Sequence, residues 1–585
     1  MKKRVVSLLL IVLLVFSSGC GMFPETLASP EASATASPTA TATLSPYEQP
    51  SREITPFSEM QYIRPDADAV IARINTLTKE LEDGTVSAQT LAASVGEVDK
   101  LFSNFVTMHT LARIQSSMDQ TDEKWLEEQQ YTSLHAPDVQ TADDNYITVL
   151  YNSPFKEQIE TEWDSNYFSD TSDTLLYNDE TQPFYAKESE LLDEYINTLS
   201  VGTVTYNGQE VTYNDISAME YDEYVDALAL WDEVYNPILG NIFVELVKTR
   251  NQIAQTLDYE NYTDMVFKKA DMDYTSQDAQ TLVDSIAANL VPIYDEIVNS
   301  YLPFLVEDDM SYERISAFAG ETLSAMDARL GETFKTMNDY KLIDYEPRPG
   351  KVPGGFTIYL DDYSSPFVIF SYINDEQSMR TLIHEFGHFN DDCITNTAIT
   401  ESTDTAEIFS QALELLFSLH YGELFGEETA AELQYNILFD NFSAMIDQAH
   451  YTAMEFEIYS LPTEEITLEK INSIAQTTAE RFKIKSDISY LDWVSVTHLF
   501  QTPFYLISYA TSMDIALQLW EIALTDERAA MDVYYTLLAR EKSPKFSENI
   551  EHAGLRSPFD INETEKIAEL MRYHLIDNAP ADAAA

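Results

Sequence analysis

The stretch TLIHEFGH, residues 381–388, contains a His-Glu-x-x-His motif inside a segment with helical periodicity. Residues four apart on a helix lie on one face with Cβ atoms roughly 6 Å apart, so His384 and His388 can bind one metal ion. Glu385 then lies beside that ion, where it can take a proton from water. This composition yields roughly 0.02 such motifs by chance, so the stretch predicts a metal site rather than two surface histidines.

The residues around the motif predict the helix that carries it. Asn374 followed by Gln377 is typical of a helix N-terminus, and an apolar face follows. That face is formed by Met379, Leu382, Ile383 and Phe386. The histidine pair therefore lies in the middle of a helix, as a shared metal ion requires.

A catalytic zinc ion generally has three protein ligands and one open position for water. The metzincin pattern would need a third histidine ten residues after His384, and position 394 is an isoleucine. A second helix downstream offers Glu407 instead, with Glu401 and Asp404 as alternatives. Glu414, two turns further on, either accepts the Nδ1 hydrogen of a ligand histidine or lies on a solvated face.

Composition limits the function classes. Hydrophobic residues make up 45% of the 585 residues and aromatic residues 12%, which is enough for a large globular core. The formal net charge is −65, spread along the chain, and the pI is near 4.1. Such a negative field repels phosphate backbones, which argues against a nucleic-acid partner.

The N-terminus predicts export and a lipid anchor. Residues 1–20 read as a signal peptide, with a basic start and a short apolar run that ends in Ser-Ser-Gly-Cys. This ending resembles a bacterial lipobox, so Cys20 is the expected lipidation site on an extracytoplasmic, membrane-anchored protein; the alternative is a plain secretory signal. Cys393 is the only other cysteine, which leaves no intramolecular disulfide. Residues 21–58, rich in Ala, Ser, Thr and Pro, predict a disordered tether.

The body is predicted to be mainly helical. Residues 59–345 form a helical N-terminal region with an Asn-Gly hairpin at 203–213, residues 346–577 form the catalytic region, and residues 578–585 form a tail. The predicted helices cover 66–81, 87–118, 123–134, 221–257, 261–269, 276–300 and 312–337. The absence of a regular strand–helix alternation argues against a doubly wound fold.

Two strands, 354–360 and 366–373, are predicted to lead directly into the motif helix. A strand beside a metal site can hold an extended peptide through its backbone, which makes Gly354, Gly355 and Phe356 candidate substrate-binding residues. The alternative for the glycine pair is an ordinary tight turn.

A further candidate group lies near residue 500. His498, Tyr505 and Tyr509 can donate hydrogen bonds to the oxyanion that develops on a scissile carbonyl. The chain contains 35 tyrosines, so these residues are weak evidence without further context.

In combination, the motifs resemble the ordered signature of the thimet oligopeptidase and oligoendopeptidase F family of zinc metallopeptidases. The residues that carry this resemblance are His384-Glu385-Phe386-Gly387-His388, Glu407-x-x-Ser410-Gln411-x-x-Glu414, His498, Pro503-Phe504-Tyr505 and Tyr509-Ala510. Arg250-Asn251-Gln252 with Leu257-Asp258-Tyr259 is similar to the family's upstream helix pair.

The resemblance implies a mainly α, two-lobed zincin-type fold, with a small β-sheet beside the motif helix and a deep channel that admits short unstructured peptides. It also implies one Zn²⁺ per chain with Glu407 as the third ligand. His498, Tyr505 and Tyr509 would bind substrate or stabilise the transition state.

The chain departs from the family pattern in three ways, one of which is a shorter loop between His388 and Glu407. Asn390, Asp391 and Asp392 stand where a further histidine is usual, and Ser512 replaces a frequent glycine. These departures affect the shape of the substrate channel more than the metal chemistry. The alternative to a peptidase is a peptide-binding lipoprotein with a vestigial metal site, and an intact Glu385 argues against it because a pure binder needs no base there.

Overall fold

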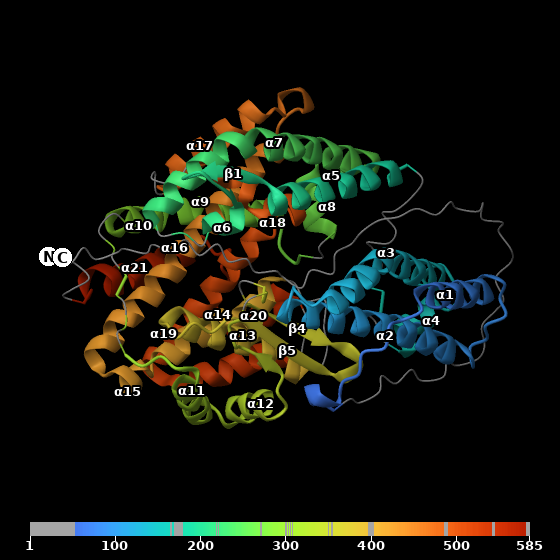
Figure 1. Ribbon diagram of the computed structural model, residues 1–585, viewed down its shortest axis with the longest axis horizontal. Coiled ribbons are helices and arrows are strands. Elements are labelled where there is room, and N and C mark those ends of the chain that lie inside the picture. Colours follow the sequence, from blue (N-terminus) through green and yellow to red (C-terminus); the bar gives the residue numbers. More distant parts are fainter. Residues whose placement is uncertain are drawn as a thin grey trace.

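The computed structural model describes residues 53–163, 167–168, 180–217, 219, 221–269, 272–298, 301, 303–304, 306, 308–348, 350–352, 355–395, 403–484, 490–540 and 545–580. Helices dominate these residues, and the few strands form a two-stranded and a three-stranded sheet. The predicted mainly α architecture is therefore confirmed. Figure 1 shows α13, α14, β4 and β5 near the middle of the molecule, with helices on either side of them.

The first helices form a unit at one side of the molecule (Figure 1). They are α1 (Ala67–Glu82), α2 (Leu91–Met118), α3 (Glu123–Tyr151) and α4 (Lys156–Glu162). Their apolar faces share a small core of their own that includes Ile74, Val98, Tyr146 and Leu150. The predicted end of a helix before Pro137 is wrong, because α3 continues through this proline. The carbonyl that loses its helical partner is that of Ser133, an exposed residue, so water can bond it, and the buried Thr132 and Val139 anchor the helix on either side.

The next segment forms the helices along the top of Figure 1 and a small hairpin. Its elements are α5 (Gln182–Val201), β1 (Thr203–Tyr206), β2 (Gln209–Thr212), α6 (Tyr213–Ser217), α7 (Tyr221–Thr256), α8 (Tyr262–Lys269), α9 (Ser276–Asn289) and α10 (Val291–Ile297). The predicted hairpin is confirmed: β1 and β2 pair antiparallel, and Asn207 and Gly208 both have positive φ, as a tight hairpin turn requires. The predicted helix 276–300 is divided at Leu290, just before the proline in the first turn of α10.

Two helices and a sheet lead to the motif. They are α11 (Tyr312–Met326), α12 (Ala328–Asp339), β3 (Ile343–Asp344), β4 (Gly355–Leu360) and β5 (Ser365–Phe370). The predicted helix 312–337 is divided at Asp327, whose side chain accepts the backbone N–H of Arg329 and caps α12. The strand order is β3-β5-β4, with β4 antiparallel and β3 parallel to β5. Because β3 belongs to this sheet, the sheet begins a few residues before the predicted boundary at residue 346.

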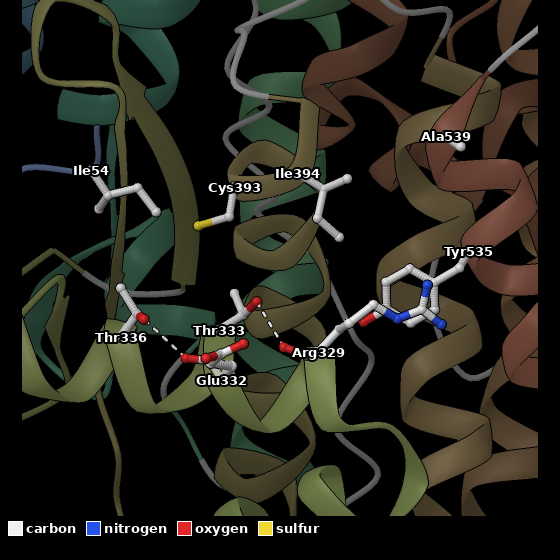
Figure 2. A pocket seen from close by; sticks show the side chains of 9 residues that line it. All are labelled: Ile54, Arg329, Glu332, Thr333, Thr336, Cys393, Ile394, Tyr535 and Ala539. Carbon is white, nitrogen blue, oxygen red and sulfur yellow. Dashed lines mark hydrogen bonds between the residues drawn. The ribbon is translucent and has the colours of Figure 1, made fainter. Parts of the chain in front are cut away.

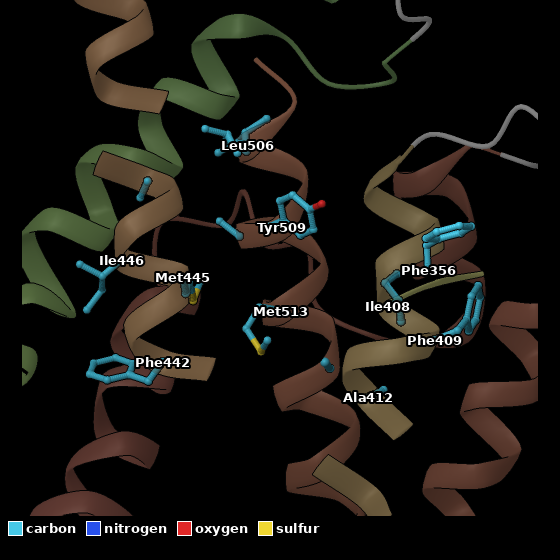
Figure 3. Packing of buried hydrophobic residues seen from close by; sticks show 14 of the residues in the cluster. Phe356, Ile408, Phe409, Ala412, Phe442, Met445, Ile446, Leu506, Tyr509 and Met513 are labelled. Atoms are coloured by element: carbon cyan, nitrogen blue, oxygen red, sulfur yellow. The ribbon is translucent and has the colours of Figure 1, made fainter. Parts of the chain in front are cut away.

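The remaining helices enclose the motif helix. They are α13 (Glu376–Thr395), α14 (Thr403–Ser418), α15 (Tyr421–Phe425), α16 (Glu427–Tyr459), α17 (Leu468–Phe482), α18 (Thr497–Gln501), α19 (Leu506–Ala539), α20 (Phe546–Ala553) and α21 (Glu563–Arg572). Figure 3 shows α19, which carries Tyr509 and Met513, between α16 and α14. Ile408, Phe409 and Ala412 are fully or almost fully buried, so α14 is a core helix and not a surface helix with one polar face.

The described chain begins with a segment that lies along the sheet. The backbone N–H of Thr55 bonds the carbonyl of Tyr363, and Ser365 Oγ donates to the carbonyl of Thr55 at 3.0 Å. The ring of Phe57 packs against that of Phe367 in a tilted arrangement, with ring centroids 4.4 Å apart. The ordered body therefore begins before residue 58, the predicted end of the tether. The predicted signal peptide with Cys20, and the tether up to residue 52, lie outside the described residues.

None of the described helices combines the length and the apolar character that a bilayer span requires.

Candidate metal centre

Three side chains converge at the contact between α13 and α14. His384 Nε2 and His388 Nε2 each lie 3.7 Å from Glu407 Oε2. The three potential ligand atoms lie within 4.8 Å of one another, and within the described residues this is the group that could hold a metal ion. Tetrahedral zinc with ligand bonds of about 2.0–2.1 Å places its ligand atoms about 3.3 Å apart, so a small adjustment of these side chains would accommodate the ion. Two imidazoles and a carboxylate are also one of the donor sets found in catalytic zinc sites.

The two ligand helices meet because residue 387 is glycine. A Cβ atom at Gly387 would lie 2.5 Å from Ser410 Cα and 2.7 Å from the carbonyl oxygen of Phe409. Both are backbone atoms of α14, which a side chain cannot displace without moving the helix. The glycine inside the motif thus permits the close approach that brings Glu407 to the histidines.

Glu414 orients the first histidine. Its Oε1 lies 2.7 Å from His384 Nδ1, and its side chain is 9% exposed. The solvated alternative for Glu414 is therefore wrong. Burial acts to lower the pKa of His384, but the hydrogen bond and charge of Glu414 outweigh it and raise that pKa to about 9. With Nδ1 bonded to Glu414, Nε2 faces Glu407, and a metal ion bound there would displace the proton that the raised pKa keeps on Nε2.

His388 has no such carboxylate partner on its other nitrogen among the described contacts. Burial lowers the pKa of His388 to about 4, and the neighbouring charge of His384 acts in the same direction. A neutral imidazole is the form that binds a metal ion.

Glu385 lies between the motif helix and strand β4. Thr357 Oγ1 donates to Glu385 Oε2 at 2.7 Å and to the backbone carbonyl of Glu385 at 3.0 Å. A Cβ atom at Gly355 would lie 3.5 Å from Glu385 Oε1, so the other carboxylate oxygen faces the glycine of the strand. Sequence reasoning missed Thr357; the available signal was a threonine on the same face of the strand as Gly355, next to the motif helix.

Asp404 and Glu401 are the predicted alternatives to Glu407 as third ligand, and the structure describes Asp404. Asp404 is fully buried and accepts hydrogen bonds from Tyr274 at 3.0 Å and from Thr511 at 2.6 Å. Its oxygens accept hydrogen bonds away from the histidines, whereas Glu407 faces the Nε2 atoms of both. Glu401 lies outside the described residues.

The three residues near position 500 come together as an aromatic cluster. The ring centroids are 5.2 Å apart for His498 and Tyr505, 6.0 Å for His498 and Tyr509, and 5.4 Å for Tyr505 and Tyr509. Burial raises the pKa of Tyr509 well above its ordinary value, and the charges of Glu407 and Glu385 add to the shift, so the phenol lies near both acids. Burial lowers the pKa of His498 to about 4, which keeps it neutral.

The predicted substrate-binding residues are only partly described. Gly355 lies in the first position of β4 and faces Glu385, whereas Phe356 points to the opposite face of the strand. There the ring is buried and lies 5.2 Å from the guanidinium carbon of Arg113 on α2. The Phe356 side chain thus faces away from the metal centre, and only its backbone is available to a peptide at this site. Gly354 lies outside the described residues.

A separate cavity of about 450 Å³ lies near the C-terminal end of the motif helix (Figure 2). Its walls come from α12, α13, α19 and the N-terminal segment at Ile54, and they include Thr336, Cys393 and Tyr535. Burial raises the pKa of the Cys393 thiol well above its ordinary value, and the charge of Asp392 adds to this. Cys393 is therefore a protonated thiol, and it is not part of the group of metal-ligand candidates.

Solved structures of other proteins share the fold of this chain. The chain resembles a protein assigned as an oligoendopeptidase F, with a TM-score of 0.76 and 21% identity over 91% of this chain and all of that one. It also resembles PZ peptidase A in a complex with an inhibitor, with a TM-score of 0.76 and 20% identity over 89% of this chain and 99% of that one. These likenesses confirm the zincin-like fold that the sequence predicts.

Two protein-family models match the chain and assign it to a family. The model of the peptidase M3 N-terminal domain matches residues 57–175, and the model of peptidase family M3 matches residues 322–567, which together are more than half of the chain. Oligopeptidase PepF of Bacillus subtilis (strain 168) is 20% identical over 450 residues, which are 67% of this chain and 65% of that protein. The chain belongs to peptidase family M3, and the family predicted from the motifs is confirmed.

Proposed function

We propose that this protein is a zinc-dependent endopeptidase that hydrolyses short unstructured peptides outside the cytoplasm. The observation that carries the proposal is the convergence of His384, His388 and Glu407, with Glu385 held beside them by Thr357. Family membership and the PepF relative support peptide hydrolysis as the reaction.

The residues of the site divide the chemistry between them. His384, His388 and Glu407 would hold the zinc ion, which when bound activates water and polarises the scissile carbonyl. Glu385 takes the proton from the attacking water and passes it to the leaving amine. Thr357 fixes one carboxylate oxygen of Glu385, so that the other remains available for the proton.

The aromatic cluster supplies hydrogen-bond donors. Tyr509 lies near Glu385 and Glu407, and its raised pKa keeps the phenol protonated, so that it can donate to the developing oxyanion. Neutral His498 and Tyr505 extend this donor surface. A donor aimed at the oxyanion typically contributes on the order of 100-fold or more to the rate.

Substrate binding is assigned to strand β4. Within the described sheet this strand pairs with β5 on one edge only, and Gly355 lies on it opposite Glu385. An extended peptide that pairs with the other edge would pass in front of the metal centre. Recognition through the backbone suits short peptides of varied sequence.

We also propose that the protein is anchored to a bacterial membrane through a lipid on Cys20. The support is the sequence of residues 1–20, and the partner would be the membrane surface that the lipid enters. Detergent phase partitioning of the full-length protein expressed in a bacterium tests this: wild type is expected in the detergent phase and Cys20→Ala in the aqueous phase. Equal partitioning of the two would contradict lipidation.

A fluorogenic peptide library tests the proposed reaction. The purified protein is expected to cleave short peptides, to lose this activity with a chelator and to regain it when zinc is added. Glu423→Gln, a change at an exposed glutamate of α15, serves as a control that should retain full activity. Binding of peptides without cleavage would instead support a peptide-binding lipoprotein with a vestigial metal site.

A further inference from the structure

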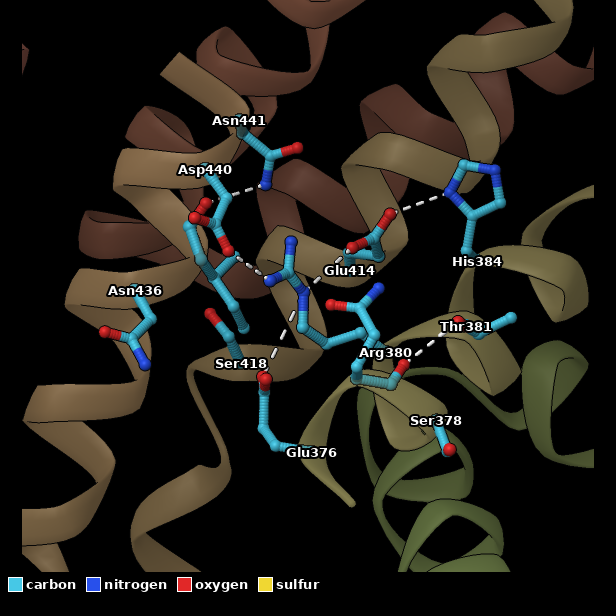
Figure 4. A network of polar contacts seen from close by, with 12 residues as sticks. Glu376, Ser378, Arg380, Thr381, His384, Glu414, Ser418, Asn436, Asp440 and Asn441 are labelled. Carbon is cyan, nitrogen blue, oxygen red and sulfur yellow. Dashed lines mark hydrogen bonds and ion pairs between the residues drawn. The ribbon is translucent and has the colours of Figure 1, made fainter. Parts of the chain in front are cut away.

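A buried arginine adjoins the metal centre. Arg380 lies one helical turn before His384 on α13, and its side chain is 5% exposed. Its Nη1 lies 2.7 Å from Asp440 Oδ2 on α16, and its Nε lies 3.4 Å from Glu414 Oε2 on α14. Figure 4 shows the guanidinium between these two carboxylates, with Glu376 at its other side, 3.9 Å from Nε.

Glu414 is held at both of its carboxylate oxygens. Oε2 faces the guanidinium of Arg380, and Oε1 faces the Nδ1 atom of His384 at 2.7 Å. A glutamate side chain has three rotatable bonds, so a single contact with an imidazole would leave it considerable freedom. The second contact removes that freedom and directs Oε1 at the ring.

The orientation of the ring follows from that of Glu414. With Nδ1 bonded to Oε1, the opposite nitrogen Nε2 faces Glu407 Oε2 at 3.7 Å. The contacts thus form a continuous series from Asp440 through Arg380 and Glu414 to His384 (Figure 4). Asp440 is 26% exposed, so the series begins near the surface and ends at the metal centre.

We propose that Arg380 is a positioning residue for the metal centre, which acts through Glu414 to hold the His384 imidazole in its ligand orientation. The inference rests on the proposed metal-dependent function and deepens it. A guanidinium suits the role because its planar fork can contact two carboxylates at fixed angles, which an ammonium cannot reproduce. An arginine that only tied three helices together would affect stability and leave the metal affinity unchanged.

The zinc dissociation constant, measured by chelator competition, tests the proposal. Loss of an outer partner of a ligand histidine typically weakens metal binding about 10–100-fold, so Glu414→Ala is expected in that range. Arg380→Met, one contact further away, is expected to weaken zinc binding about 3–10-fold. Arg380→Lys is expected to recover part of that loss.

A double variant distinguishes action through Glu414 from a separate effect. Arg380→Met combined with Glu414→Ala is expected to bind zinc no more weakly than Glu414→Ala alone, because Arg380 then has no carboxylate to orient. Additive losses in the double variant would overturn the proposal. Should Arg380→Met fail to fold, the single variants Asp440→Asn and Arg380→Lys are measured instead. Unchanged zinc affinity in both variants would overturn the proposal.

Arg540→Met is the matched control. Arg540 is also a buried arginine bonded to an α13 carboxylate, with its Nη2 2.9 Å from Asp391 Oδ2. The Arg540→Met variant is expected to lose stability and to keep the wild-type zinc affinity. An equal loss of zinc affinity in Arg540→Met and Arg380→Met would overturn the proposal. Wild-type protein that binds no zinc would refute the proposed function as well, whereas normal zinc binding and cleavage with an unaffected Arg380→Met would refute this inference alone.

Discussion

Replacement of Gly387 by alanine is expected to separate α13 from α14 at the point where they carry the metal ligands. The added Cβ atom would lie 2.5 Å from Ser410 Cα and 2.7 Å from the Phe409 carbonyl oxygen. Ordinary carbon contacts are about 3.5 Å or longer, so the helices must move apart by about 1 Å. The opposing atoms belong to a helix backbone inside the core, which cannot turn aside as a flexible side chain would.

The expected change in the free energy of unfolding of Gly387→Ala is the sum of two opposing effects. Alanine is a better helix former than glycine by about 1 kcal/mol, and this favours the variant. Overpacking of a core typically costs about 1–3 kcal/mol, and this opposes it. Gly320→Ala on α11 measures the first effect alone, because its added Cβ would meet only the ring of Phe334 at 3.7 Å, an ordinary contact.

Thermal or denaturant unfolding of the two variants measures the difference. Gly320→Ala is expected to equal or exceed the wild type in stability, and Gly387→Ala is expected to be less stable than Gly320→Ala by about 1–3 kcal/mol. Zinc affinity should fall in Gly387→Ala alone, because Glu407 moves away from the histidines. If Gly387→Ala matched the wild type in both stability and zinc affinity, the close approach would not be what builds the site.

Three further predictions follow from individual contacts. Glu407→Ala is expected to weaken zinc binding by more than the roughly 10–100-fold cost of removing an outer partner of a ligand, whereas Asp404→Asn should keep the metal. Chelator competition measures both variants, and the opposite result would move the ligand role to Asp404. Thr357→Val is expected to lower kcat several-fold with unchanged zinc content, because Glu385 loses its hydrogen bond; steady-state kinetics with metal analysis checks this, and an unchanged kcat would contradict it. Burial raises the pKa of Glu455 to about 8, so the folded protein holds a proton there that the unfolded chain releases near pH 4.5. The folded state therefore loses stability as pH rises from about 4.5 to about 8. Across that window the melting temperature of Glu455→Gln should increase relative to that of the wild type, and parallel pH profiles of the two proteins would contradict a raised pKa of Glu455.

Much of the metal centre could be predicted because its signal is local. His384, Glu385 and His388 occupy one helix, so helical geometry alone brings them together. Glu407 could be proposed from its helix, but the choice over Asp404 depended on packing that no spacing reveals. Asp404 faces Tyr274 and Thr511, two residues that are distant in sequence.

Contacts between separate helices were the part that sequence reasoning could not supply. Arg380 follows the same helical pattern as its neighbours, and nothing in that pattern shows that Glu414 and Asp440 meet its guanidinium. A predicted helix boundary was wrong for a related reason. The predicted N-terminus at Asn374 is replaced by Asp375, whose side chain accepts the backbone N–H of Ser378, while Asn374 takes a positive φ. Several short polar residues in sequence offer equivalent caps, and only the direction of the incoming chain decides between them.

The most direct test of the central claim compares wild type with Glu385→Gln for zinc content and peptide cleavage. The amide keeps the size of the side chain and cannot take a proton from water. Both proteins are expected to bind one zinc ion per chain, and only the wild type should cleave peptides. Full cleavage by Glu385→Gln, or a wild type that binds zinc and cleaves no peptide, would contradict the account.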